Sequence, residues 1–277
     1  MKSHTVPKKL LEQFAYYHPQ TQSKRLWRYH KGWKPHGNAS PKTATRWDGH
    51  FADPTNSEKE AELEERLKRE FEDPVNQFLE MLAYKKFVWS AIHTIKLSGY
   101  VKMLFNRSAA RKAASPQQVA LKLQPFKDLL EDEEALSTLA AKYTLDMLER
   151  GDLPGPMVTK QDVLDGLKRA IKNNSGPDQS QIDYVATIET MMNQPDDQMI
   201  NGKWTIIPTE PDNPFVIGDA PVVTWERTAE NRLMFGMGFA RPNVEIMLPV
   251  SPTACLHIQP DVPRTREVRR PDRKSVV

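Results

Sequence analysis

The sequence predicts an α+β fold in which an N-terminal strand and a C-terminal antiparallel sheet flank an inserted helical block. Three observations support this class. Aromatic and basic residues alternate near the N-terminus, apolar residues recur at helical spacing from about 57 to 193, and short β-rich runs follow from Asn201. Helices inserted between an early strand and a late sheet indicate one α+β domain, which we expect over residues 1–262.

The composition is that of a globular protein, with 39% hydrophobic and 27% charged residues in a chain of 277. No apolar run approaches the roughly 18 residues that a membrane-spanning helix needs, so we expect no membrane partner. Residues 1–7 lack the apolar stretch of a secretory signal. The single cysteine, Cys255, excludes an internal disulfide framework and a cysteine-rich zinc site. Together these features predict a cytoplasmic protein.

The N-terminal strand is expected over residues 24–30, where aromatic residues alternate with basic ones at a period of two. This strand could pair with the C-terminal sheet. Proline, glycine and asparagine then indicate a loop over residues 34–41.

Four sequence signals mark expected helix starts in the middle of the chain. They are the capping-box pair Ser57 and Glu60, the Asp73-Pro74 step, the Ser115-Pro116 step and the expected cap Thr159. Apolar stripes follow Asp73-Pro74 at residues 75–82 and Thr159 at residues 163–171. A further stripe covers residues 136–147, and Ile182 and Val185 suggest a last helix.

The C-terminal third contains six β-rich runs separated by turn residues, as in an antiparallel sheet. The runs cover residues 204–207, 215–217, 222–225, 233–235, 244–248 and 254–258.

Three short motifs resemble the domain-of-unknown-function family DUF4238. They are HTVPKKLLEQF at residues 4–14, FVIGDAPV at 215–222 and LPVSP at 248–252. The strand near residue 26 and the glutamate-rich segment 60–72 also stand where that family has a first β-run and an acidic helix. One departure is Gly218, where the family usually has a serine or threonine. The resemblance implies a fold shared with that family, and it implies no particular reaction.

The formal net charge of +3 is concentrated at the C-terminus. Six cations and two anions lie between Arg264 and Lys274, so the rest of the chain has a net charge of −1. We expect residues 263–277 to form a basic, flexible tail, which either attracts phosphates or is simply a solvated end.

His4 and Asp219 are the candidate catalytic residues. A neutral histidine can act as a general base or a metal ligand near pH 7, and Asp219 follows an apolar run at an expected strand end. If they meet, with Ser251 or His257, they could activate water, alone or through a divalent metal. The alternatives are a histidine that caps a turn and an Asx-turn aspartate.

Candidate substrate-binding residues lie in and beside the N-terminal strand: Arg25, Trp27, Arg28 and His30, joined by Ser251 from the C-terminal part. Aromatic faces interleaved with cations can stack bases and hold phosphates. An edge strand protected by charge would show the same residues.

The sequence lacks a glycine-rich phosphate loop, a His-Glu-x-x-His motif and a Rossmann fingerprint. The best hypothesis is a hydrolase with a His/Asp water-activating site, of nuclease type. The alternative is a non-catalytic module that binds nucleic acid or protein through the same strand. A third possibility is an interaction protein whose inserted helices pair with a partner.

Overall fold

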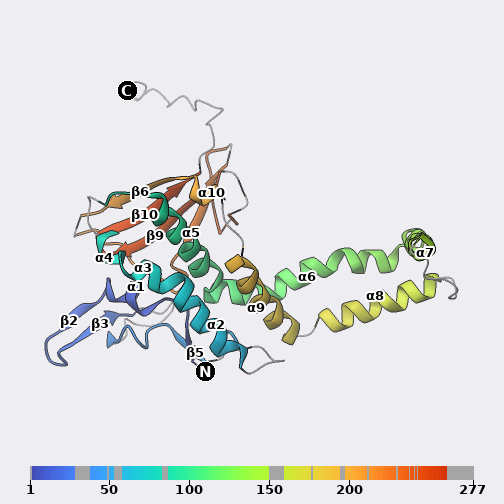
Figure 1. Ribbon diagram of the computed structural model, residues 1–277, viewed down its shortest axis with the longest axis horizontal. Coiled ribbons are helices and arrows are strands. Elements are labelled where there is room, and N and C mark those ends of the chain that lie inside the picture. Colours follow the sequence, from blue (N-terminus) through green and yellow to red (C-terminus); the bar gives the residue numbers. More distant parts are fainter. Residues whose placement is uncertain are drawn as a thin grey trace, which may run out of the picture.

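In sequence order, strands near both ends of the chain flank a long helical middle, which confirms the predicted α+β class (Figure 1). The computed structural model describes residues 2–28, 38–48, 50–52, 58–82, 87–149, 159–175, 177–193, 197–210, 212–228, 230–236, 238–239, 241 and 243–260. The predicted tail at 263–277 and the loop at 34–37 lie outside these ranges.

The N-terminal strands form two small antiparallel sheets of their own. β1 (Lys2–His4) pairs with β5 (Arg46–Asp48), while β2 (Tyr16–His18), β3 (Ser23–Trp27) and β4 (Asn38–Ala39) form a sheet in the order β2-β3-β4. The predicted strand is therefore β3, and it ends at Trp27. The expected pairing of this strand with the C-terminal sheet is wrong, because both sides of β3 are taken by β2 and β4.

The first helices pack the N-terminal strands against the core. Short α1 (Lys8–Glu12) buries Leu10 and Leu11. Farther along the chain, α2 (Lys59–Leu67) continues without a break through the π-helical segment η1 (Lys68–Glu72) into α3 (Asp73–Asn76). The short helix α4 (Leu79–Leu82) follows.

Two predicted helix starts differ from the structure in this region. Asp73 has helical dihedrals of φ −61° and ψ −40°, so it caps nothing, and Pro74 lies in a helix that runs on from α2. A π-helical segment before the proline shifts the hydrogen-bond pattern that the proline ring would otherwise break. Ser57 lies outside the described residues. Its expected capping partner, Glu60, is buried and accepts a hydrogen bond from Ser3 instead.

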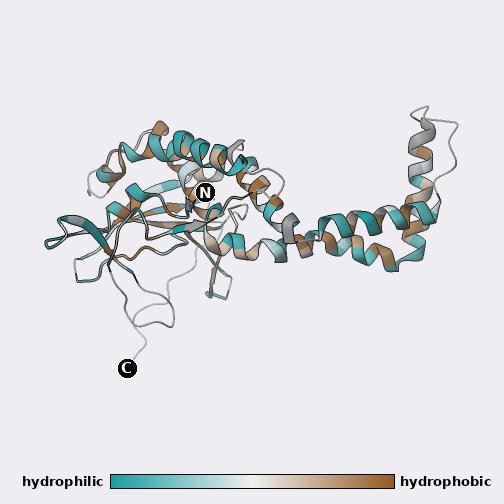
Figure 2. Cartoon of the chain, turned by 90° about the horizontal axis from the view of Figure 1, so that it is seen from below, coloured by the Kyte–Doolittle hydropathy of each residue, from teal (hydrophilic) through white to brown (hydrophobic). Residues whose placement is uncertain are grey.

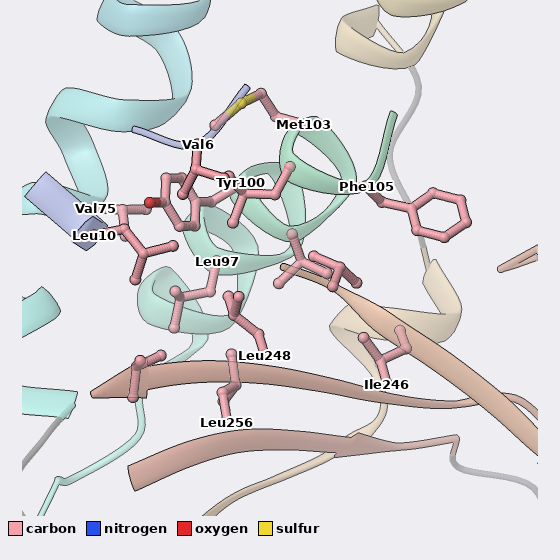
Figure 3. Close-up of a cluster of buried hydrophobic side chains, with 14 of the residues drawn as sticks. Val6, Leu10, Val75, Leu97, Tyr100, Met103, Phe105, Ile246, Leu248 and Leu256 are labelled. Carbon is pink, nitrogen blue, oxygen red and sulfur yellow. The ribbon is translucent and has the colours of Figure 1, made fainter. Parts of the chain in front are cut away.

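The central helix α5 (Ala91–Asn106) lies between these helices and the C-terminal sheet. Its buried face includes Leu97 and Tyr100, which point toward Leu248 of the sheet and toward the N-terminal segment (Figure 3). Gly99 permits the closest approach: a Cβ atom there would lie 2.9 Å from the Phe71 ring of η1.

The next helices form an arm that projects from the body in both views (Figures 1 and 2). α6 (Ala109–Glu131) runs outward, α7 (Glu133–Glu149) lies at the tip, and α8 (Lys160–Asn174) returns to α9 (Pro177–Asn193) and α10 (Asp197–Ile200). The predicted start at Ser115-Pro116 is wrong, because α6 begins after Ser108, whose hydroxyl accepts from the Arg111 amide. The predicted cap at Thr159 is confirmed as a complete capping box with Asp162.

The C-terminal sheet has five antiparallel strands in the order β6-β10-β9-β7-β8. They are β6 (Lys203–Pro208), β7 (Val223–Arg227), β8 (Leu233–Phe235), β9 (Glu245–Ser251) and β10 (Ala254–Gln259). Five of the six predicted runs are confirmed. The run 215–217 is irregular instead, and its Val216 is 80% exposed.

Candidate functional site

His4 lies at the end of β1 with its ring tied to the backbone. Its Nε2 lies 2.8 Å from the carbonyl oxygen of Lys42. Because a carbonyl only accepts, Nε2 carries the proton and Nδ1 is left as an acceptor. The His4 carbonyl in turn accepts a hydrogen bond from the Arg107 guanidinium, so the residue is held on both sides.

Asp219 lies on the surface, in the irregular segment between β6 and β7. Within the described residues, no hydrogen bond or ion pair joins it to His4. The same part of the chain holds no group of three or more histidine, cysteine, aspartate or glutamate side chains able to bind a metal ion. A His4–Asp219 site thus stays a prediction from the sequence.

Ser251 and His257 are engaged within the C-terminal sheet. Ser251 is buried at the end of β9, where its hydroxyl accepts a hydrogen bond from the Thr253 amide at 3.3 Å. This contact organises the turn that leads into β10. His257 lies 2.7 Å from the Glu245 carboxylate on the neighbouring strand.

Three of the predicted substrate-binding residues, Arg25, Trp27 and Arg28, lie on the hairpin of β2 and β3, residues 16–28, which we call the ribbon. Antiparallel register places Arg25 opposite Tyr16, and Trp27 shares their face because side chains alternate along a strand. The rings of Tyr16 and Trp27 are stacked, with centroids 5.7 Å apart and planes 15° from parallel. Trp27 is 62% exposed, so the stack presents an open aromatic surface.

The other face of the ribbon anchors it. Leu26 is 6% exposed and belongs to the main hydrophobic core. Farther out on the same face, Tyr17 is 64% exposed and stands opposite the exposed Lys24. Arg28 is exposed directly after β3, and His30 lies outside the described residues. The ribbon is therefore fixed by Leu26 at its base, beside the Tyr16–Trp27 stack, and displays Tyr17 and Lys24 farther toward its turn.

The charge of this region is much larger than the overall net charge suggests. Residues 1–48 contain ten lysines and arginines and only two carboxylates, a net charge of +8, whereas residues 49–263 have a net charge of −9. The prediction that only the C-terminal tail is basic is therefore wrong. The two regions cancel in the sum, and a count along shorter windows would have found the basic N-terminus.

A buried polar cluster behind β1 was not predicted. Arg107, at the joint between α5 and α6, is 1% exposed and donates to Glu72 and to both oxygens of Glu64. Burial lowers the pKa of Arg107, but the two carboxylates outweigh it and leave the pKa above its usual value. The guanidinium therefore stays charged, and its contacts link β1, α2, η1 and the α5–α6 joint.

His50 extends this cluster toward the arm. Its Nε2 donates to the Arg107 carbonyl at 2.8 Å, and the Tyr184 hydroxyl lies 3.0 Å from the same nitrogen. Burial lowers the pKa of His50 to about 4, helped by the nearby cations Lys112 and Arg107. A neutral, fully engaged histidine of this kind fits a structural role. The sequence around His50 contains no motif that would have predicted this structural role.

The comparisons agree with the sequence motifs. No helix in the described part of the chain has the length and apolar character needed to cross a membrane. Neither a curated protein nor a solved structure matches the chain. The family model of DUF4238, described as a protein of unknown function, matches residues 2–276, so the chain belongs to this family.

Proposed function

We propose that this protein binds single-stranded nucleic acid through the ribbon. The observation that supports the proposal is the Tyr16–Trp27 stack, whose Trp27 ring is exposed, with Arg25 on the same face. An aromatic face of this kind can extend its stack onto an unpaired base, while a neighbouring guanidinium pairs with the adjoining phosphate. A duplex hides its base faces, so single strands are the favoured ligand.

The charge distribution supports the same proposal. The net charge of +8 over residues 1–48 favours encounters with a polyanion. Arg25 on the face of the stack and Arg28 directly after β3 are placed to contact adjoining phosphates. Binding through about two such contacts would weaken with salt, with a logarithmic slope of about −1.4 for a single strand.

A cytoplasmic location belongs to this proposal. The single cysteine is buried in β10, and burial raises its pKa to about 12, so it is kept as an unreactive thiol. A reduced, buried thiol is compatible with a reducing compartment.

The replacement Trp27→Ala tests the proposal. Loss of one stacking partner should weaken binding of a fluorescent single strand, about 12 nucleotides long, by roughly 5- to 150-fold. Fluorescence anisotropy with RNA and DNA strands, and with a duplex of the same length, measures the effect. Phe235→Ala is the matched control, because Phe235 is 64% exposed on β8 of the other sheet. Equal affinity of all three proteins, or a preference for the duplex, would contradict the proposal.

Hydrolysis at His4 and Asp219 is a second proposal that the same samples test. Within the described residues no hydrogen bond reaches Nδ1 of His4, so this nitrogen is an acceptor suited to a general base, which supports the second proposal. Incubation of the labelled strands with and without Mg²⁺ or Mn²⁺ would show cleavage directly. Cleavage that disappears in the His4→Ala, Asp219→Ala double variant would support a nuclease, and intact strands would leave binding alone.

A further inference from the structure

The two ends of the molecule carry opposite charges. The ribbon lies at one end of the long axis and α7 at the other, in both views (Figures 1 and 2). Residues 1–48, which include the ribbon, have a net charge of +8. Residues 128–149, which we call the acidic tip, contain seven carboxylates and one lysine, a net charge of −6.

A hollow of about 410 Å³ opens at the acidic tip, between the end of α6 and the first turns of α7. Its half-buried floor is apolar and consists of Leu129, Ala135 and Leu139, and its exposed rim is polar and consists of Asp132, Glu134, Thr138 and Lys142. Within the described residues, the Glu134 carboxylate has no ion-pair partner, whereas Glu133 is paired with Lys160 at 3.1 Å. The hollow thus offers apolar contact beside an unneutralised carboxylate.

We infer that the hollow at the acidic tip of one copy of this chain receives the ribbon of a second copy. The ribbon supplies what the hollow lacks: the exposed Trp27 ring with Arg25 on one face, and the exposed Tyr17 ring with Lys24 on the other. Aromatic side chains are strong anchors in apolar recesses, and opposite charges steer the two surfaces together. The ribbon cannot reach the hollow of its own chain, since the two lie at opposite ends of the molecule.

If two copies exchange this contact, they form a symmetric dimer with two-fold symmetry. When two elongated copies lie antiparallel, each ribbon meets the other copy's acidic tip, and the contact forms twice. One fully covered aromatic ring buries about 150–250 Å², so two contacts bury about 300–500 Å² through the rings, and the rest of the roughly 1,200 Å² of a stable interface must come from the surfaces beside them. The ribbon is the surface used in the proposed function. The inference does not need nucleic acid to bind, but a bound strand would compete with pairing.

Sedimentation velocity at about 1 to 100 μM, in low and in high salt, tests the inference. We expect a dimer that dissociates with added salt. The Glu134→Lys, Thr138→Lys variant places two cations on the hollow and should weaken association by at least about tenfold. The matched control is Gln161→Lys, Asp165→Lys: both residues are exposed one turn apart on α8, bond to each other, and do not line the hollow. This control should associate like the unmodified protein.

Mixing two defective variants gives the sharpest test. Trp27→Ala keeps its hollow, and Glu134→Lys, Thr138→Lys keeps its ribbon. Each variant alone has no intact contact and should be monomeric, whereas the mixture restores one contact and should form a complex that is weaker than the unmodified pair. A monomer under every condition, or association unaffected by the hollow variant, would overturn the inference. So would a monomer whose hollow binds a synthetic peptide of residues 264–274, because the occupant would then be a basic segment and not the ribbon. Anisotropy with the hollow variant measures strand binding independently of this outcome.

Discussion

Arg107 shows how one residue can hold several elements together. Its guanidinium reaches a strand carbonyl, Glu64 and Glu72, and it is almost fully buried. A buried ion pair contributes little compared with an apolar replacement of the whole set, but removing one partner leaves the others unpaired. The carboxylates of Glu64 and Glu72 are only 16% and 15% exposed, so water cannot compensate well.

The replacement Arg107→Met should therefore lower the free energy of unfolding by about 3 to 5 kcal/mol. Urea denaturation at neutral pH measures it. Arg69→Met is the control, because Arg69 is 64% exposed in its pair with Glu70 and its loss should cost about 0 to 1 kcal/mol. Similar losses for the two variants would show that the buried cluster does not stabilise the fold in this way.

At the scale of the element, α6 and α8 show where local signals succeed and fail. Thr159 caps α8 because its hydroxyl and the Asp162 carboxylate satisfy each other's backbone amides, a contact that depends only on neighbours in the sequence. Ser115-Pro116 has similar composition, yet α6 runs through it. There the Ser115 hydroxyl donates to the Ser180 carbonyl on α9 at 2.7 Å, so a packed neighbour uses the side chain that the sequence assigned to a cap.

The replacement Thr159→Ala should destabilise α8 by about 1 kcal/mol, because the Asp162 amide loses the hydroxyl that caps it. Hydrogen exchange should then be about fivefold faster for the amides in the first turns of α8. Thr187→Ala on α9 is the control, since that exposed hydroxyl only bonds back to the Asp183 carbonyl within its own helix. Unchanged exchange in α8 would mean that packing, and not the capping box, holds the start of this helix.

At the scale of the whole molecule, His50 joins the body to the base of the arm. Its ring contacts the Arg107 carbonyl and the Tyr184 hydroxyl, and its carbonyl accepts from Lys112 of α6 and Gln181 of α9. Protonation would place a charge in this buried position, next to the charged Arg107. The ring is therefore neutral in the folded protein at neutral pH.

This arrangement predicts an acid-sensitive fold. The pKa of His50 falls from 6.5 to about 4 on folding, so between these values the unfolded chain binds more protons and stability decreases as the pH falls. The loss should approach roughly 3 kcal/mol at pH 4 and be absent above pH 6.5. Urea denaturation of the protein and of His50→Gln across this range measures it. If the free energy of unfolding of His50→Gln decreased with pH as steeply as that of the unmodified protein, the role of His50 would be contradicted.

Much of the fold was predictable from local pattern, and the candidate site only in part. The apolar stripe at Val75, Phe78, Leu79 and Leu82 is buried as expected, and β3 occurs where alternation predicted it. Trp27 and Arg25 were identified as binding candidates from their alternation. The stack of Trp27 on Tyr16 was not, because it joins two strands through their register.

The sequence by itself determined the α+β class, the helical middle, the helix cap at Thr159 and the family, because periodicity, capping and short motifs act between residues a few positions apart. The tertiary structure decided that β3 pairs away from the C-terminal sheet, that Arg107 meets Glu64 and Glu72, and that a basic ribbon and an acidic tip stand at opposite ends. These features depend on which distant segments pack together and on which side chains are exposed to solvent. Both are set by the burial of the whole core rather than by any local pattern.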